Sequence, residues 1–123
     1  ITDYNKTQRS VNKLIKNEKS VLYFWNPEYI GKDYIAKRIQ YFSEKYPNVK
    51  FIGVKIKGDY KDRIYKLDIK SQYYLEPTSK ANTFLTSQIP RTILINKKGI
   101  VVNSYASLSS RKIFKQIDDL AKN

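Results

Sequence analysis

The order of apolar and polar positions predicts an α/β chain that begins with a strand–helix–strand unit. An unbroken apolar run from Val21 to Trp25 is typical of a strand buried on both faces. Residues 31–46 then show apolar positions at helical spacing, and Pro47 ends the helix because proline cannot extend its hydrogen-bond ladder. These apolar positions are Ile35, Ile39, Phe42 and Tyr46. Residues 49–57 alternate like a second strand, so the two strands are expected to run parallel.

The C-terminal part of the chain predicts a β-hairpin followed by a helix. Residues 92–95 and 100–102 are two short apolar strands, and their polar connection ends in Gly99, which suits the left-handed position of a turn. After the hairpin, Ser109 or Ser110 is the expected cap of a helix. The apolar face of that helix consists of Ile113, Phe114, Ile117, Leu120 and Ala121.

Two other segments have weaker patterns. Residues 1–19 show only loose helical spacing and are expected to form an N-terminal helical lead-in to a single domain over 20–123. Residues 59–88 are expected to hold two short helices, capped by Asp59 and Ser79. The whole order predicts an α/β fold with a central mixed sheet, built from a βαβ unit and a ββα unit and flanked by helices.

Composition removes several kinds of chemistry. The 123 residues include no cysteine, no histidine and no methionine, which excludes disulfides, thiol catalysis, Cys/His zinc sites and an imidazole base. The four glycines are isolated, so there is no phosphate-binding loop, and the neighbouring Asp118 and Asp119 are interpreted as surface charge. We therefore expect neither a cofactor nor a metal. The longest apolar run is too short to span a bilayer.

The chain is strongly basic, with 24 Lys+Arg against 11 Asp+Glu and a net charge of +13. Such a balance raises the question of nucleic acid or another polyanion as a partner. The cations are spread evenly along the sequence, and most are lysines rather than the arginines that favour bidentate phosphate recognition. This distribution weighs against nucleic acid and favours a solvated basic surface.

The element order and three local motifs resemble the thioredoxin-like superfamily. The run Val21–Trp25 is similar to the strand that leads to the thioredoxin active site, which commonly ends in Phe-Trp. Residues 89–96, Ile-Pro-Arg-Thr-Ile-Leu-Ile-Asn, are similar to the family's cis-proline segment and the strand after it. Residues 97–101 resemble the following hairpin in the TlpA-like and redoxin branch. The resemblance covers about residues 20–122 and implies a thioredoxin-like fold.

The same resemblance places the family's Cys-x-x-Cys motif at Tyr29 and Lys32. A phenol and an ammonium group cannot form a disulfide, so dithiol exchange is excluded. Pro90 matches the family's cis-proline, whose neighbouring backbone pairs with the substrate peptide in those proteins. The implied peptide-binding groove consists of Trp25, Pro27, Tyr29, Ile30, Lys32, Ile89, Pro90 and Arg91.

The favoured hypothesis is a redox-inactive thioredoxin-like domain that serves as a binding or structural module of a longer chain. Its partner would be an unidentified protein or peptide, and thiol–disulfide oxidoreductase activity is not expected. Two alternatives stay open: a non-redox enzyme that uses Tyr29 or Lys32 in the same groove, and an electrostatic binder of nucleic acid or anionic glycan. The family resemblance, rather than any residue of the chain, implies a bacterial envelope or periplasmic setting.

Overall fold

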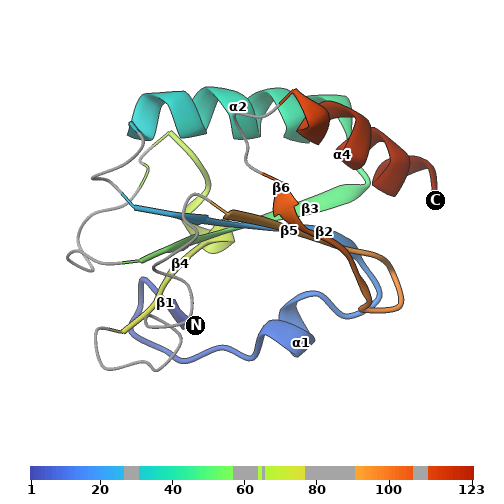
Figure 1. Cartoon of the computed structure of the whole chain (residues 1–123). Helices are drawn as coiled ribbons and strands as arrows, with labels where there is room; N and C mark the ends of the chain where they lie inside the picture. Colours follow the sequence, from blue (N-terminus) through green and yellow to red (C-terminus); the bar gives the residue numbers. More distant parts are fainter. Residues whose placement is uncertain (27–30, 57–63, 65, 77–90, 107–110) are drawn as a thin grey trace.

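The fold is a single mixed sheet with helices on both faces (Figure 1). The computed structural model describes residues 1–26, 31–56, 64, 66–76, 91–106 and 111–123. Within them the elements are β1 (Thr2–Asp3), α1 (Val11–Leu14), β2 (Lys19–Trp25), α2 (Lys32–Lys45), β3 (Val49–Lys55), η1 (Ile69–Ser71), β4 (Gln72–Tyr74), β5 (Arg91–Ile95), β6 (Val101–Ala106) and α4 (Lys112–Lys122). The described strands are ordered β1-β4-β3-β2-β5-β6.

The pairing directions confirm the mixed sheet that the sequence predicts. β2 and β3 are parallel, as are β3 and β4, so the strand–helix–strand unit has the expected form. The pairs β1–β4, β2–β5 and β5–β6 are antiparallel. β2 is therefore central, which explains why its sequence is apolar on both faces.

Alternation along β2 divides the core into two clusters. Val21, Tyr23 and Trp25 belong to the cluster on the face covered by α2 and α4, whereas Leu22 belongs to the cluster on the face that α1 covers (Figure 1). The predicted apolar positions of α2 are all buried in the first cluster, together with Ile113, Ile117 and Leu120 of α4. Both amphipathic helices are thus confirmed.

Aromatic side chains fill the space between the two helices and the sheet. The ring of Phe42 stacks on that of Phe51, with centroids 6.3 Å apart, and lies 5.1 Å from that of Phe114. The guanidinium of Arg38 covers the outside of this cluster, 5.0 Å from the centroid of Phe42 and 4.7 Å from that of Phe114. Such cation–π contacts stabilise a boundary between core and solvent.

A close contact joins the two central parallel strands. Tyr23 on β2 lies opposite Gly53 on β3. A Cβ atom at position 53 would lie 2.5 Å from the hydroxyl oxygen and 2.6 Å from Cζ of Tyr23. Only glycine leaves room for this buried ring, which lies close to the β3 backbone on the α2 face.

The turn of the β5–β6 hairpin has the predicted chemistry. Gly99 adopts a φ of 81°, and its N–H donates to the carbonyl of Asn96 at 2.9 Å. The Asn96 side-chain oxygen accepts hydrogen bonds from the N–H groups of Lys98 and Ile100, each at 3.0 Å. This asparagine therefore organises the turn from its first residue.

The N-terminal and middle segments contain two strands that the sequence pattern does not predict. Residues 1–19 hold the short helix α1, but they also hold β1, which pairs with β4 at the edge of the sheet. The division between a lead-in and a domain over 20–123 stays a prediction. Asp59, Ser79, Ser109 and Ser110, the predicted caps, lie outside the described residues, and Arg111 occupies the N-cap position of α4.

A buried glutamine at the start of β4 forms hydrogen bonds with the backbone of the preceding residues. The Gln72 side chain accepts from the N–H of Ile64 at 2.8 Å and donates to the carbonyls of Ile64 and Leu67 at 2.8 and 3.0 Å. These bonds satisfy backbone groups that a helix or strand would otherwise pair. Gln72 therefore links Ile64 and Leu67 to the start of β4, and hydrophobic spacing does not reveal this polar contact.

Candidate functional site

The carboxyl ends of the parallel strands β2 and β3 and the start of α2 meet at one end of the sheet. The strands stay paired to their last residues, because Trp25 lies opposite Lys55 and the N–H of Ile56 donates to the Trp25 carbonyl at 2.9 Å. In open α/β folds, the crevice beyond the carboxyl ends of parallel strands is the usual place for a ligand. This end of the sheet is the candidate site.

Three of the predicted groove residues are described, and all three lie at this end. Trp25 is 3% exposed and ends β2. Lys32 is half-buried and is the first residue of α2, which starts on the same side of Figure 1 as the end of β2. Arg91 begins β5 opposite Phe24, so its backbone is one residue from the level of Trp25. The other five, Pro27, Tyr29, Ile30, Ile89 and Pro90, lie outside the described residues.

The start of α2 has an unusual charge arrangement. Gly31 occupies the N-cap position in an extended conformation and makes no side-chain cap bond. Asp33 lies in the first turn, where a carboxylate is favoured by the helix dipole, and its Oδ1 is 3.4 Å from Nζ of Lys66. Lys32 places a cation at the same helix end. The helix dipole disfavours a cation there, so this helix end combines the positive end of the dipole with a positive side chain.

Two further residues of the site were not singled out from the sequence. Lys55 is 2% exposed and Asn26 is 1% exposed, so both polar side chains are buried beside Trp25. The signal for Lys55 is its position in the alternation, since Val49, Phe51 and Lys55 share one parity along β3. A buried ammonium group requires polar partners, so Lys55 is an uncommon residue for the interior of a sheet.

The fully buried Tyr23 precedes Trp25 by two residues on β2 and lies on the same face of the sheet. Burial raises the pKa of its phenol well above the ordinary value, so Tyr23 is neutral throughout the physiological range. It therefore adds no charge to the site.

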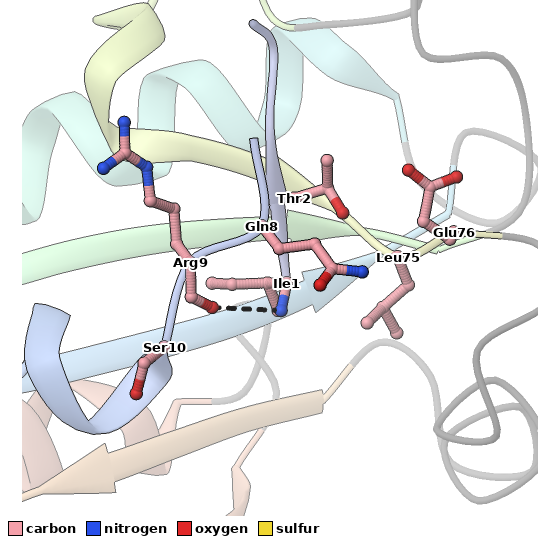
Figure 2. Close-up of a pocket in the computed structure, with 7 residues that line it drawn as sticks. All are labelled: Ile1, Thr2, Gln8, Arg9, Ser10, Leu75 and Glu76. Carbon is pink, nitrogen blue, oxygen red and sulfur yellow. Dashed lines mark hydrogen bonds between the residues drawn. The ribbon is translucent and has the colours of Figure 1, made fainter. Parts of the chain in front are cut away.

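A polar hollow of about 490 Å³ lies elsewhere, beside β1 and the end of β4 (Figure 2). Its lining residues are Ile1, Thr2, Gln8, Arg9, Ser10, Leu75 and Glu76. Figure 2 shows the guanidinium of Arg9 pointing away from Gln8 and Ser10. That guanidinium is held by Asp3, whose Oδ2 is 2.8 Å from Nε, and the Asp3 pKa is lowered by backbone N–H donation from Thr7 and then by Arg9.

The residues of this hollow do not form a catalytic arrangement. Arg9 is committed to Asp3, and none of the lining residues is a nucleophile paired with a base. Elsewhere, Asp118 accepts hydrogen bonds from Tyr46 and Lys122, as expected of a surface carboxylate. Within the described ranges, no cluster of three or more acidic residues could hold a metal ion.

Comparison with known proteins identifies the fold. No family model matches the chain, and no curated protein matches it. Among solved structures, the chain is similar to MTB DsbF, with a TM-score of 0.71, 17% identity, and 97% of this chain and 92% of that chain covered. It is also similar to a secreted Mycobacterium tuberculosis disulfide oxidoreductase homologous to E. coli DsbE, with a TM-score of 0.70, 15% identity and coverage of 97% and 93%.

A third similar structure is the thioredoxin domain of a thiol–disulfide oxidoreductase from Bacteroides vulgatus. The TM-score is 0.67 and the identity 18%, over 98% of this chain and 90% of that one. Similarity at such low sequence identity establishes only the fold. It confirms the thioredoxin-like fold that the sequence resemblance implies. The chain therefore has the thioredoxin-like fold of thiol–disulfide oxidoreductases, and it has that fold without a single cysteine.

Proposed function

We propose that this chain is a redox-inactive thioredoxin-like module that binds an extended protein segment at the carboxyl end of β2 and β3. One observation carries the proposal: the fold of thiol–disulfide oxidoreductases is kept over 97% of the chain, while no cysteine is present. Disulfide exchange needs an attacking thiolate and a resolving thiol. This chain contains neither thiol. The peptide-binding surface of the predicted groove is therefore the part of the site that is left for function.

The described part of the groove supports peptide binding. Trp25 is buried at the end of β2, and Lys32 is a half-buried cation at the start of α2. The sequence adds Tyr29 and Arg91 to the same predicted surface. Aromatic and cationic side chains around a buried apolar centre are the residue types that most often anchor protein contacts.

The proposal includes an extracytoplasmic setting. One of the similar structures is described as a secreted disulfide oxidoreductase, and a redox-inactive relative would meet extended protein substrates in the same compartment. Among the described helices, none is long and apolar enough to cross a membrane.

The electrostatic alternative predicts one coherent basic face. The described cations instead lie on both faces of the sheet: Lys13 is on α1, whereas Lys37 and Lys115 are on α2 and α4. This distribution favours the groove over charge alone as the source of specificity. The enzyme alternative would require Lys32 to act as a nucleophile, and reductive trapping of a carbonyl substrate on Lys32 would support it.

The test is capture of a partner from native extract by the immobilised chain at low and moderate salt. The double variant Tyr29→Ala/Pro90→Ala removes a predicted anchor and the predicted peptide-pairing turn. We expect the wild type to retain a partner at moderate salt and the double variant to lose it. Tyr41→Ala is the matched control, because Tyr41 is an exposed tyrosine in the second half of α2, whereas the predicted groove includes the start of that helix.

Two results would contradict the proposal. Capture that is released by moderate salt and unchanged by the double variant would assign binding to the basic surface. Capture lost equally with Tyr41→Ala would show that the effect is not specific to the groove. Circular dichroism of each variant establishes that the fold is intact before either comparison is made.

A further inference from the structure

The outer edge of β6 presents an exposed apolar segment. β6 ends the sheet, and no described strand pairs with its outer side. Ile100, Val101 and Val102 are 57%, 53% and 52% exposed, and they are consecutive. Edge strands are usually blunted by charged side chains at such positions, because an unpaired edge can accept another strand. Here the three positions are β-branched and apolar, which suits strand pairing.

The apolar surface continues onto both faces of the sheet. Val102 lines a hollow of about 270 Å³ together with Leu94 and Leu120, on the side of α4. Val101 lies opposite Ile95, whose side chain belongs to the cluster on the α1 face. If a further strand paired with β6, its side chains on both faces of the sheet would therefore lie beside apolar residues.

The turn end of the same hairpin is cationic. Lys16, Lys97 and Lys98 line a second hollow of about 310 Å³, beside the α1 segment. The remaining lining residues are Asn12, Ile15, Asn17 and Gly99, so no carboxylate contributes to it. Among the described residues, none of these three lysines forms an ion pair. The hollow has the charge and amide donors that suit a carboxylate-bearing partner.

Charge also decides between the two kinds of strand that could pair with this edge. A second copy of the chain would bring another net charge of +13 to the interface, and the repulsion opposes self-association. An acidic segment is attracted both by the whole molecule and by the three lysines.

We infer that the outer edge of β6 docks an extended segment of a partner protein that is acidic at one end. Its β-branched side chains pack against Val101 and Val102, and its carboxylates lie at Lys16, Lys97 and Lys98. The backbone of the segment extends the sheet by one strand.

This surface is separate from the proposed groove. Along β5, Arg91 lies opposite Phe24 near the carboxyl end of β2, whereas Ile95 lies opposite Ser20 near its amino end. The hairpin turn after Ile95 is therefore at the other end of the sheet, at the right of Figure 1. Variants of one surface are therefore expected to leave the other unchanged, and the two proposals are tested independently.

The test uses the intact chain and a displayed library of short random peptides. We expect enriched peptides to combine β-branched residues with Asp or Glu at one end. For a selected peptide, fluorescence anisotropy should show about tenfold weaker binding to Val101→Lys and to Lys97→Glu/Lys98→Glu. Replacing the peptide's acidic residues with lysines should restore its binding to the charge-reversed variant. Ile69→Lys, a change at another exposed apolar residue, is the control and should bind as the wild type does.

Three outcomes would overturn the inference. The first is a library that yields no enriched peptide, and the second is enriched peptides whose binding is unaffected by Val101→Lys. The third is a dimer in sedimentation velocity that Val101→Lys dissociates, which would assign the edge to a second copy. Val101 is more than half exposed, so its substitution is expected to leave the fold intact, and thermal unfolding checks this.

Discussion

The two ends of the central sheet differ in the residues that are buried and exposed. At the carboxyl end of β2 and β3, the polar side chains of Asn26 and Lys55 are buried beside Trp25. At the hairpin end, the lysines of the turn are exposed, and so are the apolar residues Ile100 and Val102. Buried Asn26 and Lys55 at one end and exposed Ile100 and Val102 at the other depart from the usual burial preference, whereas the exposed lysines and the buried Trp25 follow it. These residues carry the comparison between the two ends, and each end is the place of one of the proposed binding surfaces.

The difference lies in what a substitution would change. At the carboxyl end, side chains such as that of Trp25 are part of the core, so a change there is expected to act on folding as well as on the binding that we propose. At the hairpin end, side chains such as that of Val102 are half exposed, so a change there is expected to affect stability little and to act mainly on the binding that we propose. The following predictions test this contrast, from the largest expected effect to the smallest.

Truncation of Trp25 should have the largest effect on stability. Its ring is buried in the cluster shared with α2, so Trp25→Ala is expected to lower the free energy of unfolding by about 3–5 kcal/mol. Val102→Ala at the other end should lower it by less than about 0.5 kcal/mol, since that side chain is half exposed. Urea unfolding followed by circular dichroism measures both. Equal losses would remove the contrast between the ends.

Substitution of Gly53 should have an intermediate effect. A Cβ at this position meets the ring of Tyr23, so Gly53→Ala is expected to cost about 1–3 kcal/mol through overpacking. In a Tyr23→Ala background the same change should cost less, because the space is then open. A double-mutant cycle measures this coupling. Strict additivity of the two changes would show that the contact does not limit the packing of β2 against β3.

The smallest effect concerns Asp118, a half-buried carboxylate on α4. Hydrogen bonds from Lys122 at 2.7 Å and from Tyr46 at 3.0 Å lower its pKa below the ordinary value. A lowered folded-state pKa contributes stability above the unfolded pKa, and that contribution is lost as the pH falls through the folded value. The stability difference between wild type and Asp118→Asn should therefore be present at pH 7 and vanish in strong acid. A difference that grows on acidification would contradict this assignment.

Much of the fold could be predicted from the sequence because its central elements have strong periodic signals. The run into Trp25, the stripe of α2 and the Asn96–Gly99 turn each follow from local patterns, and all are confirmed. β1 and β4 are only two and three residues long, so no alternation could reveal them. Their positions depend on long-range contacts such as those of Gln72, which a single sequence does not display.

The candidate site was predicted in part. Trp25, Lys32 and the backbone of Arg91 lie at one end of the sheet, as the family resemblance implies. The burial of Lys55 was missed, since a lysine in a strand is ordinarily assigned to a solvated face. Its exclusion from solvent follows from the position of β3 inside the sheet and from the cover that α2 provides, and both are tertiary properties.

The central claim is that a thioredoxin-like scaffold keeps its active-site end while Tyr29 and Lys32 stand where the cysteines would be. Restoring two cysteines tests it most directly. The variant Tyr29→Cys/Lys32→Cys contains only these two thiols, because the wild type contains none. The account predicts that it forms an intramolecular disulfide under mild oxidation and catalyses disulfide reduction, measured by mass spectrometry and by insulin turbidity with dithiothreitol. A variant that stays folded but forms no such disulfide would contradict the account.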